Sequence, residues 1–521
     1  MKKLASYTTS EGLDLVGLAS IQTPFGTGIN MGLRLFLLLA VLFLGSACNK
    51  GDDPTPSDPV DPVDPVNNFD INDITDTYHT LAPLSNVYKW GPYNVHDPSI
   101  FKDGDTYYCY STDAAYGVAV RPGIQIRKSK DLIEWGFVGW VFDQLPLKGK
   151  AFIQSKGGTP NEGLWAPYIL KVGNEYRLYY SLASNLGRLS VIGLATANTP
   201  LGPWVEKEVV VSSLNIATVH TNAIDPTVLV DEAGRHWMYY GSSWDAIYLM
   251  ELNPTTGLAK TSGDKGVRIA HRGFTGNTIN GNIEGSEIIY NPDFNQYYLF
   301  ISYDWLGTKY NVRVGRSPSP EGPFLDFNGL DMNELSDNKP MILAPYQFNG
   351  HSGWQGVAHP TVFSDSNGQF YIAHQGRPGV DPSFMVLHNR KIYWTTDGWP
   401  ITSPERYAGV VQSAVTSADI AGSYEQIILN YRVVPGFAET QLLPDFQTAI
   451  PLTLSADGKL NGDAGSTWSF DAPWLTLSWS NGYTDVLHAD FGRDWENKVE
   501  KTLLLSGLNQ EGTAVWAKKI N

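Results

Sequence analysis

Five segments of the chain repeat one pattern, and this repetition is the feature that most constrains the fold. Each segment has a short polar or aromatic start, an apolar stretch, a turn, and a second stretch rich in aromatic residues. The segments read HDPSIFKDGDTYYCYST, WAPYILKVGNEYRLYYSLAS, DPTVLVDEAGRHWMYYGSS, EGSEIIYNPDFNQYYLFISY and HPTVFSDSNGQFYIAHQG. Their starts lie at 97, 165, 225, 284 and 359, a spacing of 59 to 75 residues that suits a four-stranded unit with its loops.

This period predicts an all-β, five-bladed β-propeller over residues 75–410. Closing five blades into a ring removes the exposed sheet edges that an open array would carry. Since the first strand of each blade lines the axis, equivalent repeat positions are expected at one mouth of the axial channel. These positions are Asp97, Trp165, Asp225, Glu284 and His359.

Three carboxylates in such a ring indicate chemistry. An Asp-Pro pair taken alone is an ordinary turn signal, but like charges brought together in register cost free energy without a purpose. Hydrolysis of a glycosidic bond needs one carboxylic acid to protonate the leaving oxygen and one carboxylate to activate water or attack directly. A third carboxylate raises the pKa of an acid by repulsion. Glu284 has the longer reach and is the expected acid, while the roles of Asp97 and Asp225 stay open on these grounds.

The pattern over about residues 88–405 resembles the family 43 glycoside hydrolases, which are five-bladed propellers that include endo-arabinanases, arabinofuranosidases and xylosidases. The resemblance implies that Asp97 in VHDPSIF is the general base, Asp225 in NAIDPTVLV the pKa modulator and Glu284 in NIEGSEIIY the general acid. It also implies an inverting mechanism, for which the carboxyls of base and acid are expected roughly 6.5–9.5 Å apart.

The sequence departs from the family pattern after Glu284, where Ser286 and Glu287 follow. Glu287 is therefore a rival for the acid role. If Glu284 begins the inner strand, side-chain alternation places Glu287 on the opposite face, and Glu284 is preferred.

Trp165 and His359 complete the expected ring. Trp165 in LWAPYI also matches the family, where an indole forms a sugar-facing wall, and the alternative is a core tryptophan. His359 in GVAHPTVF resembles the axial histidine of the arabinanase branch, and this implies a calcium ion in the channel. Calcium prefers oxygen ligands, so water would have to complete its coordination around a single histidine.

The repeat stops after Trp399-Pro400, and residues 411–521 show short alternating strands. This stretch resembles the small lipocalin-like β-barrel that follows the propeller in one arabinanase subgroup. Its presence favours an endo-acting 1,5-α-L-arabinanase over a xylosidase, with arabinan or a related plant cell-wall polysaccharide as the partner. A structural role is expected for the barrel itself.

The N-terminal residues predict export. Residues 1–48 end in an apolar stretch and the small residues GSA before Cys48, which resembles a bacterial lipoprotein signal; the alternative is an ordinary signal peptide. Met31 is a second candidate for the start. Residues 49–74 repeat Asp-Pro-Val and predict an extended tether. A lysine and two aspartates after Cys48 resemble the surface-export signal of Bacteroidetes lipoproteins, so the expected location is the outer-membrane surface, with Cys48 lipidated.

Charge and composition exclude some functions. The net charge is −16, and no cluster of Lys and Arg stands out, so a nucleic-acid partner is not expected. The alternatives left open are an exo-acting α-L-arabinofuranosidase or β-xylosidase of the same fold, and a non-catalytic glycan-binding surface lipoprotein. The second predicts the loss of at least one acid, whereas all three are present.

Overall fold

The computed structural model describes residues 69–117, 119–214, 221–243, 246–272, 282–432 and 442–520, together with the backbone of 274–275 and 278–279. The chain divides into two compact units, Met1–Phe69 and Asp70–Asn521. The predicted leader, signal sequence and lipidated Cys48 lie outside the described residues.

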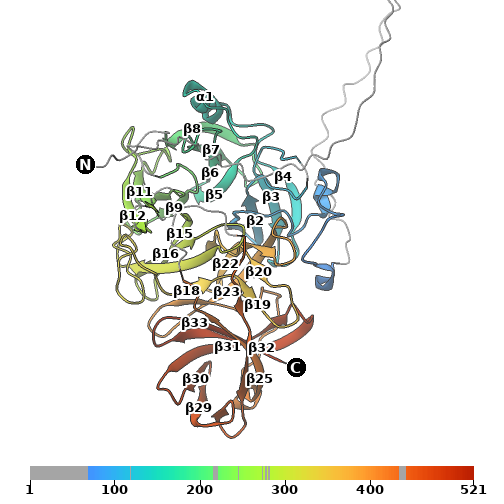
Figure 1. Cartoon of the computed structure of the whole chain (residues 1–521). Coiled ribbons are helices and arrows are strands. Elements are labelled where there is room, and N and C mark those ends of the chain that lie inside the picture. Colours follow the sequence, from blue (N-terminus) through green and yellow to red (C-terminus); the bar gives the residue numbers. More distant parts are fainter. Residues whose placement is uncertain are drawn as a thin grey trace, which may run out of the picture. The chain divides into compact units, whose positions relative to one another are not determined.

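Four separate sheets each contain four antiparallel strands in a regular meander (Figure 1). The first comprises β1 (Ser99–Asp103), β2 (Thr106–Ser111), β3 (Gln125–Ser129) and β4 (Gly136–Trp140), and the second β5 (Trp165–Val172), β6 (Glu175–Leu182), β7 (Val191–Ala197) and β8 (Val205–Ser212). The third comprises β9 (Thr227–Val230), β10 (His236–Tyr240), β11 (Ala246–Leu252) and β12 (Val267–His271), and the fourth β15 (Ile283–Asn291), β16 (Gln296–Tyr303), β17 (Asn311–Ser317) and β18 (Met341–Leu343). A two-stranded sheet of β13 (Phe274–Thr275) and β14 (Thr278–Ile279) stands between them in the sequence.

A fifth sheet repeats this order within a larger assembly. β21 (Thr361–Ser364), β22 (Phe370–Pro378), β23 (Val386–Trp394) and β24 (Pro400–Thr402) pair in sequence, each antiparallel to the next. β22 continues past β21 and also pairs with β20 (Trp354–Gln355), which pairs with β19 (Tyr346–Gln347). With β26 (Gln447–Thr448), which pairs with β19, the resulting sheet has seven strands.

Local sequence sets the register of these sheets. In the first sheet Asp103 pairs with Thr106, so the hairpin turn has two residues, and Gly104 takes the positive φ of +60° that such a turn requires. The second sheet has the same arrangement, with Val172 paired to Glu175 across Gly173 at φ +61°. Both turns lie at the end of the first strand that is distant from the repeat start.

The first strands of the five sheets neighbour one another around a ring. β1 contacts β5, β5 contacts β9, β9 contacts β15, β15 contacts β21, and β21 returns to β1. The molecule is therefore an all-β propeller whose inner strands begin next to Asp97, Trp165, Asp225, Glu284 and His359. Buried aromatic and aliphatic side chains from adjacent sheets fill the spaces between them.

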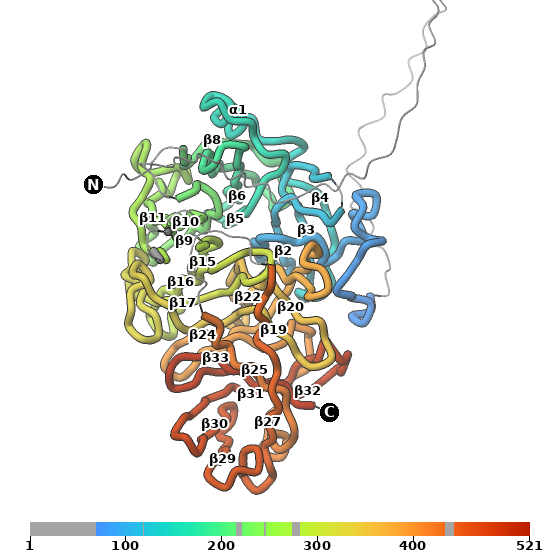
Figure 2. Tube along the Cα trace, in the orientation of Figure 1, coloured from blue at the N-terminus to red at the C-terminus, as the bar shows by residue number. Residues whose placement is uncertain are grey.

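A closed eight-stranded barrel follows the propeller. Its strands, in barrel order, are β25 (Gly422–Leu429), β27 (Ile450–Leu454), β28 (Lys459–Leu460), β29 (Asp463–Asp471), β30 (Trp474–Ser478), β31 (Thr484–Asp494), β32 (Val499–Asn509) and β33 (Ala514–Lys519). Buried leucines from five of these strands fill its interior, so the barrel has a packed core. In Figure 2 the trace passes from the yellow strands of the propeller into the orange and red strands of the barrel.

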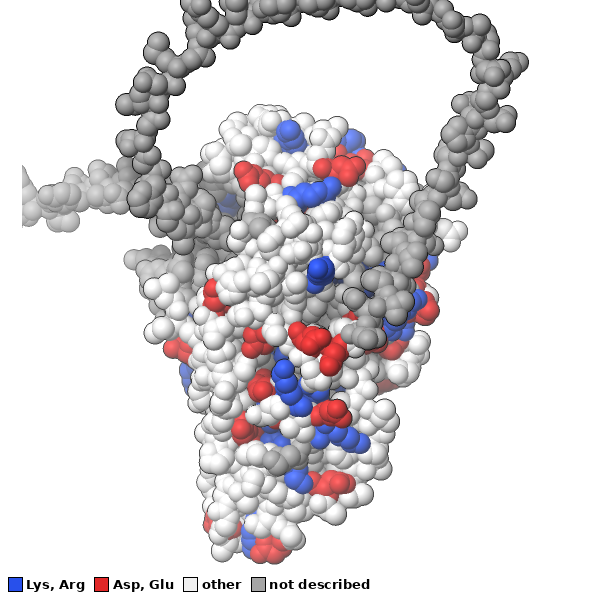
Figure 3. All heavy atoms as spheres, turned by 90° about the vertical axis from the view of Figure 1, so that its right-hand side faces the viewer, with Lys and Arg blue, Asp and Glu red and all other residues white. Residues whose placement is uncertain are grey.

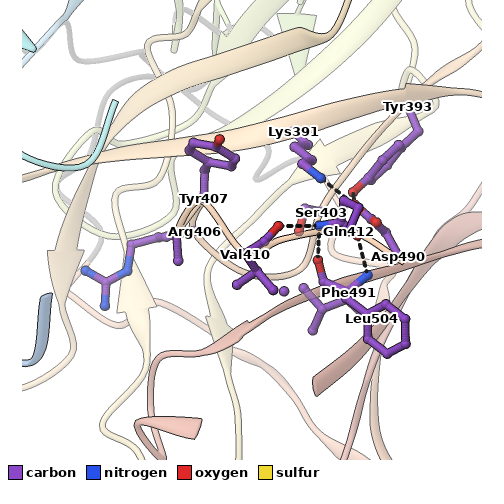
Figure 4. A pocket seen from close by; sticks show the side chains of 12 residues that line it. Lys391, Tyr393, Ser403, Arg406, Tyr407, Val410, Gln412, Asp490, Phe491 and Leu504 are labelled. Carbon is purple, nitrogen blue, oxygen red and sulfur yellow. Dashed lines mark hydrogen bonds and ion pairs between the residues drawn. The ribbon is translucent and has the colours of Figure 1, made fainter. Parts of the chain in front are cut away.

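The barrel and the propeller are joined by one shared strand pair and by polar contacts. β26 (Gln447–Thr448), which lies between barrel strands β25 and β27 in the sequence, pairs in parallel with β19 of the propeller sheet. Around the small cavity in Figure 4, Lys391 and Tyr393 of β23 both contact the Asp490 carboxylate of β31, with Lys391 Nζ 2.7 Å from Asp490 Oδ2. Lys518 of β33 lies between three carboxylates, those of Glu405, Asp494 and Glu496, at 2.6–3.0 Å.

Helices are short and peripheral. They are η1 (Ile71–Asp73), η2 (Leu84–Lys89), α1 (Leu147–Ser155) and α2 (Ser417–Ile420). Within the described part of the chain no helix is long and apolar enough to span a membrane. On the face shown in Figure 3, acidic and basic side chains are interspersed among a larger number of neutral ones, so this face carries no extended basic surface for a polyanion.

Candidate active site

One backbone feature recurs at the start of all five inner strands. Asp97, Ala166, Asp225, Gly285 and His359 have φ values of +49°, +34°, +58°, +56° and +54°. Four of the five are followed by proline, so the left-handed residue and the proline together redirect the chain into the inner strand. Positive φ is uncommon for residues other than glycine, and its recurrence marks these positions as structurally equivalent.

This equivalence corrects the predicted ring by one residue at two positions. Asp97, Asp225 and His359 occupy equivalent sites as expected, but Trp165 and Glu284 each lie one residue before the equivalent site, which Ala166 and Gly285 fill. In Gly285 the missing side chain is required, because a Cβ there would lie 2.9 Å from His359 Nδ1. Glu284 therefore extends from a different point of the turn than the two aspartates.

Hydrogen bonds between neighbouring sheets hold these turns. In four of the five sheets, a side chain on or just after the second strand accepts the backbone N–H of a turn residue in the adjacent sheet. Thr112 Oγ1 accepts from Ala166 N at 2.8 Å, Ser181 Oγ from Asp225 N at 3.1 Å, Ser302 Oγ from His359 N at 2.9 Å and Gln375 Oε1 from Asp97 N at 3.1 Å. These contacts bring the predicted residues to one end of the ring of inner strands.

Asp97 is buried and surrounded by donors. Its Oδ2 accepts the hydroxyl of Thr112 at 2.6 Å and lies 2.8 Å from His96 Nδ1, while Oδ1 lies 2.9 Å from His359 Nδ1. Burial raises the pKa of this carboxyl. The charges and contacts of His359 and His96 lower it by a larger amount, so the pKa of Asp97 lies well below its usual range. Asp97 is therefore an ionised carboxylate, and Oδ1 is its less crowded oxygen.

Asp225 is in the opposite state. It is 5% exposed, and its Oδ2 accepts the N–H of Gly285 at 3.2 Å. Burial is the largest influence and, against the lowering effect of His359, it combines with the charges of Glu284 and Asp97 to raise the pKa of Asp225 well above its usual range. The cluster thus retains a carboxyl proton next to an ionised carboxylate.

Glu284 differs from both aspartates in its exposure and partners. It is half-buried, whereas Asp97 and Asp225 are buried. Ser242 Oγ donates to Glu284 Oε2 at 2.6 Å, and Tyr310 Oη donates to Glu284 Oε1 at 2.8 Å. Of the three carboxylates, Glu284 is the one that a molecule arriving from solvent meets most directly.

Glu287 does not point away from the ring as alternation predicted. A β-bulge separates it from Glu284, because Glu284 pairs with Ser302 and Glu287 with Phe300, so the parity on which the prediction rested is lost. Glu287 is 2% exposed, and its Oε1 accepts from Thr227 Oγ1 at 3.1 Å. It lies among the inner strands, two residues after Gly285, which is the position equivalent to Asp225. Burial raises the pKa of Glu287 to about 7.

Trp165 is held at the rim by both of its chain neighbours. Leu164 N donates to Asp113 Oδ2 at 2.9 Å, and Ala166 N donates to Thr112 Oγ1, which also contacts Asp97. Trp165 itself is half-buried at the start of β5. An indole in this place suits a wall beside the carboxylates, as predicted, and a tryptophan of the hydrophobic core would be more deeply buried.

His359 offers one nitrogen toward a cation. Its Nδ1 faces Asp97, which leaves Nε2. Burial lowers the pKa of His359, but Asp97 and then Asp225 and Glu284 raise it to about 9, so the surroundings favour a positive charge here. Among the described residues, three or more ligating side chains converge only at Glu405, Asp494 and Glu496, where Lys518 already lies. A cation at His359 would therefore keep most of its water.

Several residues of this site were not found from the sequence. Thr112, Ser181, Ser242 and Ser302 lie within two residues of the ends of the second strands, in YST, YYS, YGS and ISY. The signal was present in the repeats, since each aromatic stretch in these four ends in a hydroxyl residue. Tyr310 has no such signal, because it comes from the connection between β16 and β17 and reaches Glu284 only through the fold.

The comparisons with known proteins agree with this geometry. The model of glycosyl hydrolases family 43 matches residues 91–400, and that of a C-terminal lipocalin-like domain matches residues 404–517. The chain is similar to an extracellular endo-α-(1→5)-L-arabinanase of Thermotoga petrophila, at 27% identity over 85% of this chain and 97% of the relative. It is also similar to extracellular endo-α-(1→5)-L-arabinanase 2 of Bacillus subtilis, at 28% identity over 82% of this chain and 93% of the relative.

Solved structures extend the similarity to three dimensions. The crystal structure of an endo-1,5-α-L-arabinanase from Thermotoga petrophila RKU-1 matches with a TM-score of 0.69 and 25% identity, covering 84% of this chain and all of that chain. The family 43 model spans more than half of the 521 residues and contains every residue of the carboxylate cluster. The chain therefore belongs to glycosyl hydrolases family 43 and is a glycoside hydrolase.

Proposed function

We propose that the protein is an endo-acting hydrolase of α-1,5-linked L-arabinan that inverts the configuration at the cleaved bond. The observation that carries this proposal is the division of states within one cluster: Asp97 ionised, Asp225 with a raised pKa, and Glu284 half-buried between two hydroxyl donors. An inverting glycosidase needs one ionised base and one protonated acid on opposite sides of the bond. The two relatives that share both modules of this chain are named as endo-arabinanases.

In the proposed reaction, Asp97 acts as the general base. A water molecule at Oδ1 gives one proton to Asp97 as its oxygen bonds to the anomeric carbon, and Oδ2 is held by Thr112 and His96. Glu284 gives its proton to the glycosidic oxygen as that bond breaks. Both groups return to their starting states by proton exchange with solvent.

Asp225 and Trp165 support these steps. Burial keeps Asp225 close to its neutral form, and its contact with Gly285 N connects it to the turn that carries Glu284. Trp165 provides a flat apolar wall against which a furanose ring can pack. The sequence of strand contacts supports the inference that β21–β24 is the fifth blade, which closes the ring next to the first.

We also propose that a calcium ion binds at His359, as the family resemblance implies. His359 would hold the ion through the nitrogen that does not face Asp97, and water would complete its shell. The ion would supply positive charge beside three carboxylates. Binding of a metal and protonation at that nitrogen exclude each other, so only one of them can balance the charge of the cluster at a time.

The proposed location is the outer-membrane surface, with Cys48 lipidated and the Asp-Pro-Val stretch as a tether. The supporting observations are the sequence around Cys48 and the extracellular assignment in the names of both relatives. Arabinan is a large polymer, so an enzyme that cleaves within it must be exposed to the medium.

Product analysis tests the function. The chain from residue 49 onward is incubated with linear 1,5-arabinan, and the products are separated by size while the anomeric configuration is followed by proton NMR. Mixed short oligosaccharides that first appear as β-anomers are expected. Release of arabinose alone would make the enzyme exo-acting, and binding of arabinan without any cleavage would leave a glycan-binding lipoprotein.

A further inference from the structure

Each oxygen of the Glu284 carboxyl group accepts one hydroxyl hydrogen bond, and one of the two donors comes from a loop. Ser242, two residues after the third blade's second strand, donates to Oε2, and Tyr310 donates to Oε1. Tyr310 is 1% exposed, so its side chain is buried in the protein. The connection Asp304–Tyr310 between β16 and β17 carries this tyrosine.

The loop is anchored in the propeller through Asp304. This residue is 3% exposed and has a φ of +70°. One carboxylate oxygen pairs with the buried guanidinium of Arg272, and the other accepts from Asn311 Nδ2 at 3.2 Å. Asn311 Nδ2 also donates to the carbonyl of Lys309 at 3.0 Å, which fixes the residue that precedes Tyr310.

The C-terminal module completes this anchor. Tyr431, two residues after barrel strand β25, donates its hydroxyl to Asp304 Oδ2 at 3.1 Å. Its carbonyl accepts from Arg313 Nη2 at 3.0 Å. Asp445, just before β26, pairs with Lys309 Nζ, which also lies 5.8 Å from the Tyr431 ring centre. Both ends of the Asp304–Tyr310 loop are thus bound by side chains of the module.

Because the Asp304–Arg272 pair is buried, the loss of one of its partners would be costly. A buried Asp–Arg pair is stable only if its remaining oxygens and protons have partners, because an unsatisfied buried charge is costly. Tyr431 supplies one of the two donors to Asp304 Oδ2. Loss of that donor would weaken the anchor at the start of the loop, and loss of Asp445 would free Lys309 at its end.

We propose that Tyr310 is a positioning residue for the acid Glu284, and that Tyr431 and Asp445 of the C-terminal module hold the loop that places it. This inference rests on the proposed role of Glu284. The Tyr310 hydroxyl, by donating to Oε1 while Ser242 donates to Oε2, fixes the orientation of the carboxyl group. Proton delivery to the leaving oxygen then starts from a fixed position.

Tyr310→Phe tests the first part, because it removes only the hydroxyl. Two substrates are compared: linear arabinan, whose leaving alcohol needs protonation, and a 4-nitrophenyl arabino-oligosaccharide, whose leaving group does not. General acid catalysis contributes about 10²–10⁴-fold, so a misplaced acid is expected to lower kcat on arabinan roughly 10–100-fold and kcat on the nitrophenyl substrate about threefold or less. KM for arabinan should change little.

Tyr431→Phe and Asp445→Asn test the second part. Each is expected to lower kcat on arabinan to about a third to a tenth of the wild-type value, and to lower kcat on the nitrophenyl substrate less. Matched controls come from the same module junction: Tyr393→Phe removes a tyrosine hydroxyl contact to Asp490, and Asp490→Asn removes a lysine–aspartate pair with Lys391. Both controls should retain wild-type kcat on arabinan.

The outcomes separate this inference from the proposed function. Equal loss on both substrates in Tyr310→Phe, or wild-type kcat, would overturn the positioning role. Module variants that behave like their controls would overturn the part assigned to the barrel. Glu284→Gln is measured alongside: if it stays active on arabinan, the proposed function fails, whereas an inactive Glu284→Gln with an unaffected Tyr310→Phe removes only the inference.

Discussion

Glu287 offers a test of the buried charge in the propeller axis. The substitution Glu287→Gln keeps the shape of the side chain and removes its ionisation. Glu287 is 2% exposed, and burial raises its pKa from the ordinary 4.5 to about 7. An acid whose pKa is raised on folding costs stability once it ionises, so the free energy of unfolding decreases as the pH rises through this interval.

The magnitude follows from the interval. One pH unit corresponds to about 1.4 kcal/mol, so complete ionisation in the folded state costs about 3 kcal/mol between pH 4 and pH 8. Below pH 4.5 both proteins are neutral at this position. The unfolding free energy of Glu287→Gln minus that of the wild type should therefore increase by about 3 kcal/mol from pH 4 to pH 8. Other buried acids titrate in both proteins and cancel.

Thermal unfolding at five pH values between 4 and 8 measures this difference. With an unfolding entropy of about 2.1 cal/mol/K per residue, roughly 450 folded residues shift their Tm by about 3 °C for 3 kcal/mol. Glu321→Gln, at an exposed glutamate, is the control and should show no trend. A difference that does not depend on pH, or one that favours the wild type more at high pH, would refute the reasoning.

Four further predictions concern the general base, the metal, the contact between the two modules and the lipid on Cys48. Asp97→Asn should lower kcat/KM on linear arabinan by about 10²–10⁴-fold in a reducing-end assay, and a loss below tenfold would exclude Asp97 as the base. Exhaustive chelation should lower activity and added calcium should restore it; unchanged activity would mean that no ion acts at His359. Lys518→Met leaves three carboxylates without their cation and should cost about 3–5 kcal/mol in chemical denaturation, whereas an unchanged midpoint would mean that the pairing is weak. Cys48→Ala should move the protein from the membrane pellet to the soluble fraction, and persistence in the pellet would argue against lipidation.

The sequence predicted the propeller and the convergence of Asp97, Asp225 and His359 because these depend on a repeated local motif. An X-Pro pair after a loop produces the same turn in several blades, and equivalent turns meet at the axis. The predicted positions of Glu284 and Trp165 were wrong by one residue, because the prediction matched side chains that suit a sugar-binding site. At Gly285 there is also no following proline to mark the left-handed residue.

The remaining errors have long-range causes. The bulge after Glu284 reversed the expected direction of Glu287, and bulges depend on the partner strand as well as on the strand itself. Tyr310 contacts Glu284 across 26 residues of sequence and Tyr431 contacts Asp304 across 127, and no local pattern reports either contact. The barrel was expected to be structural, and its contacts with the loop before β17 came only from the fold.

The pairing of β26 with β19 has a consequence for how this chain can be divided. Because β26 lies in the sequence between two barrel strands, the barrel cannot leave the propeller without stripping a strand from a propeller sheet. Shortening the chain at the apparent boundary would expose the backbone of β19 as a free edge, which invites intermolecular pairing. We therefore expect both modules to melt in a single cooperative transition, and the natural unit for expression to be the whole chain after the tether.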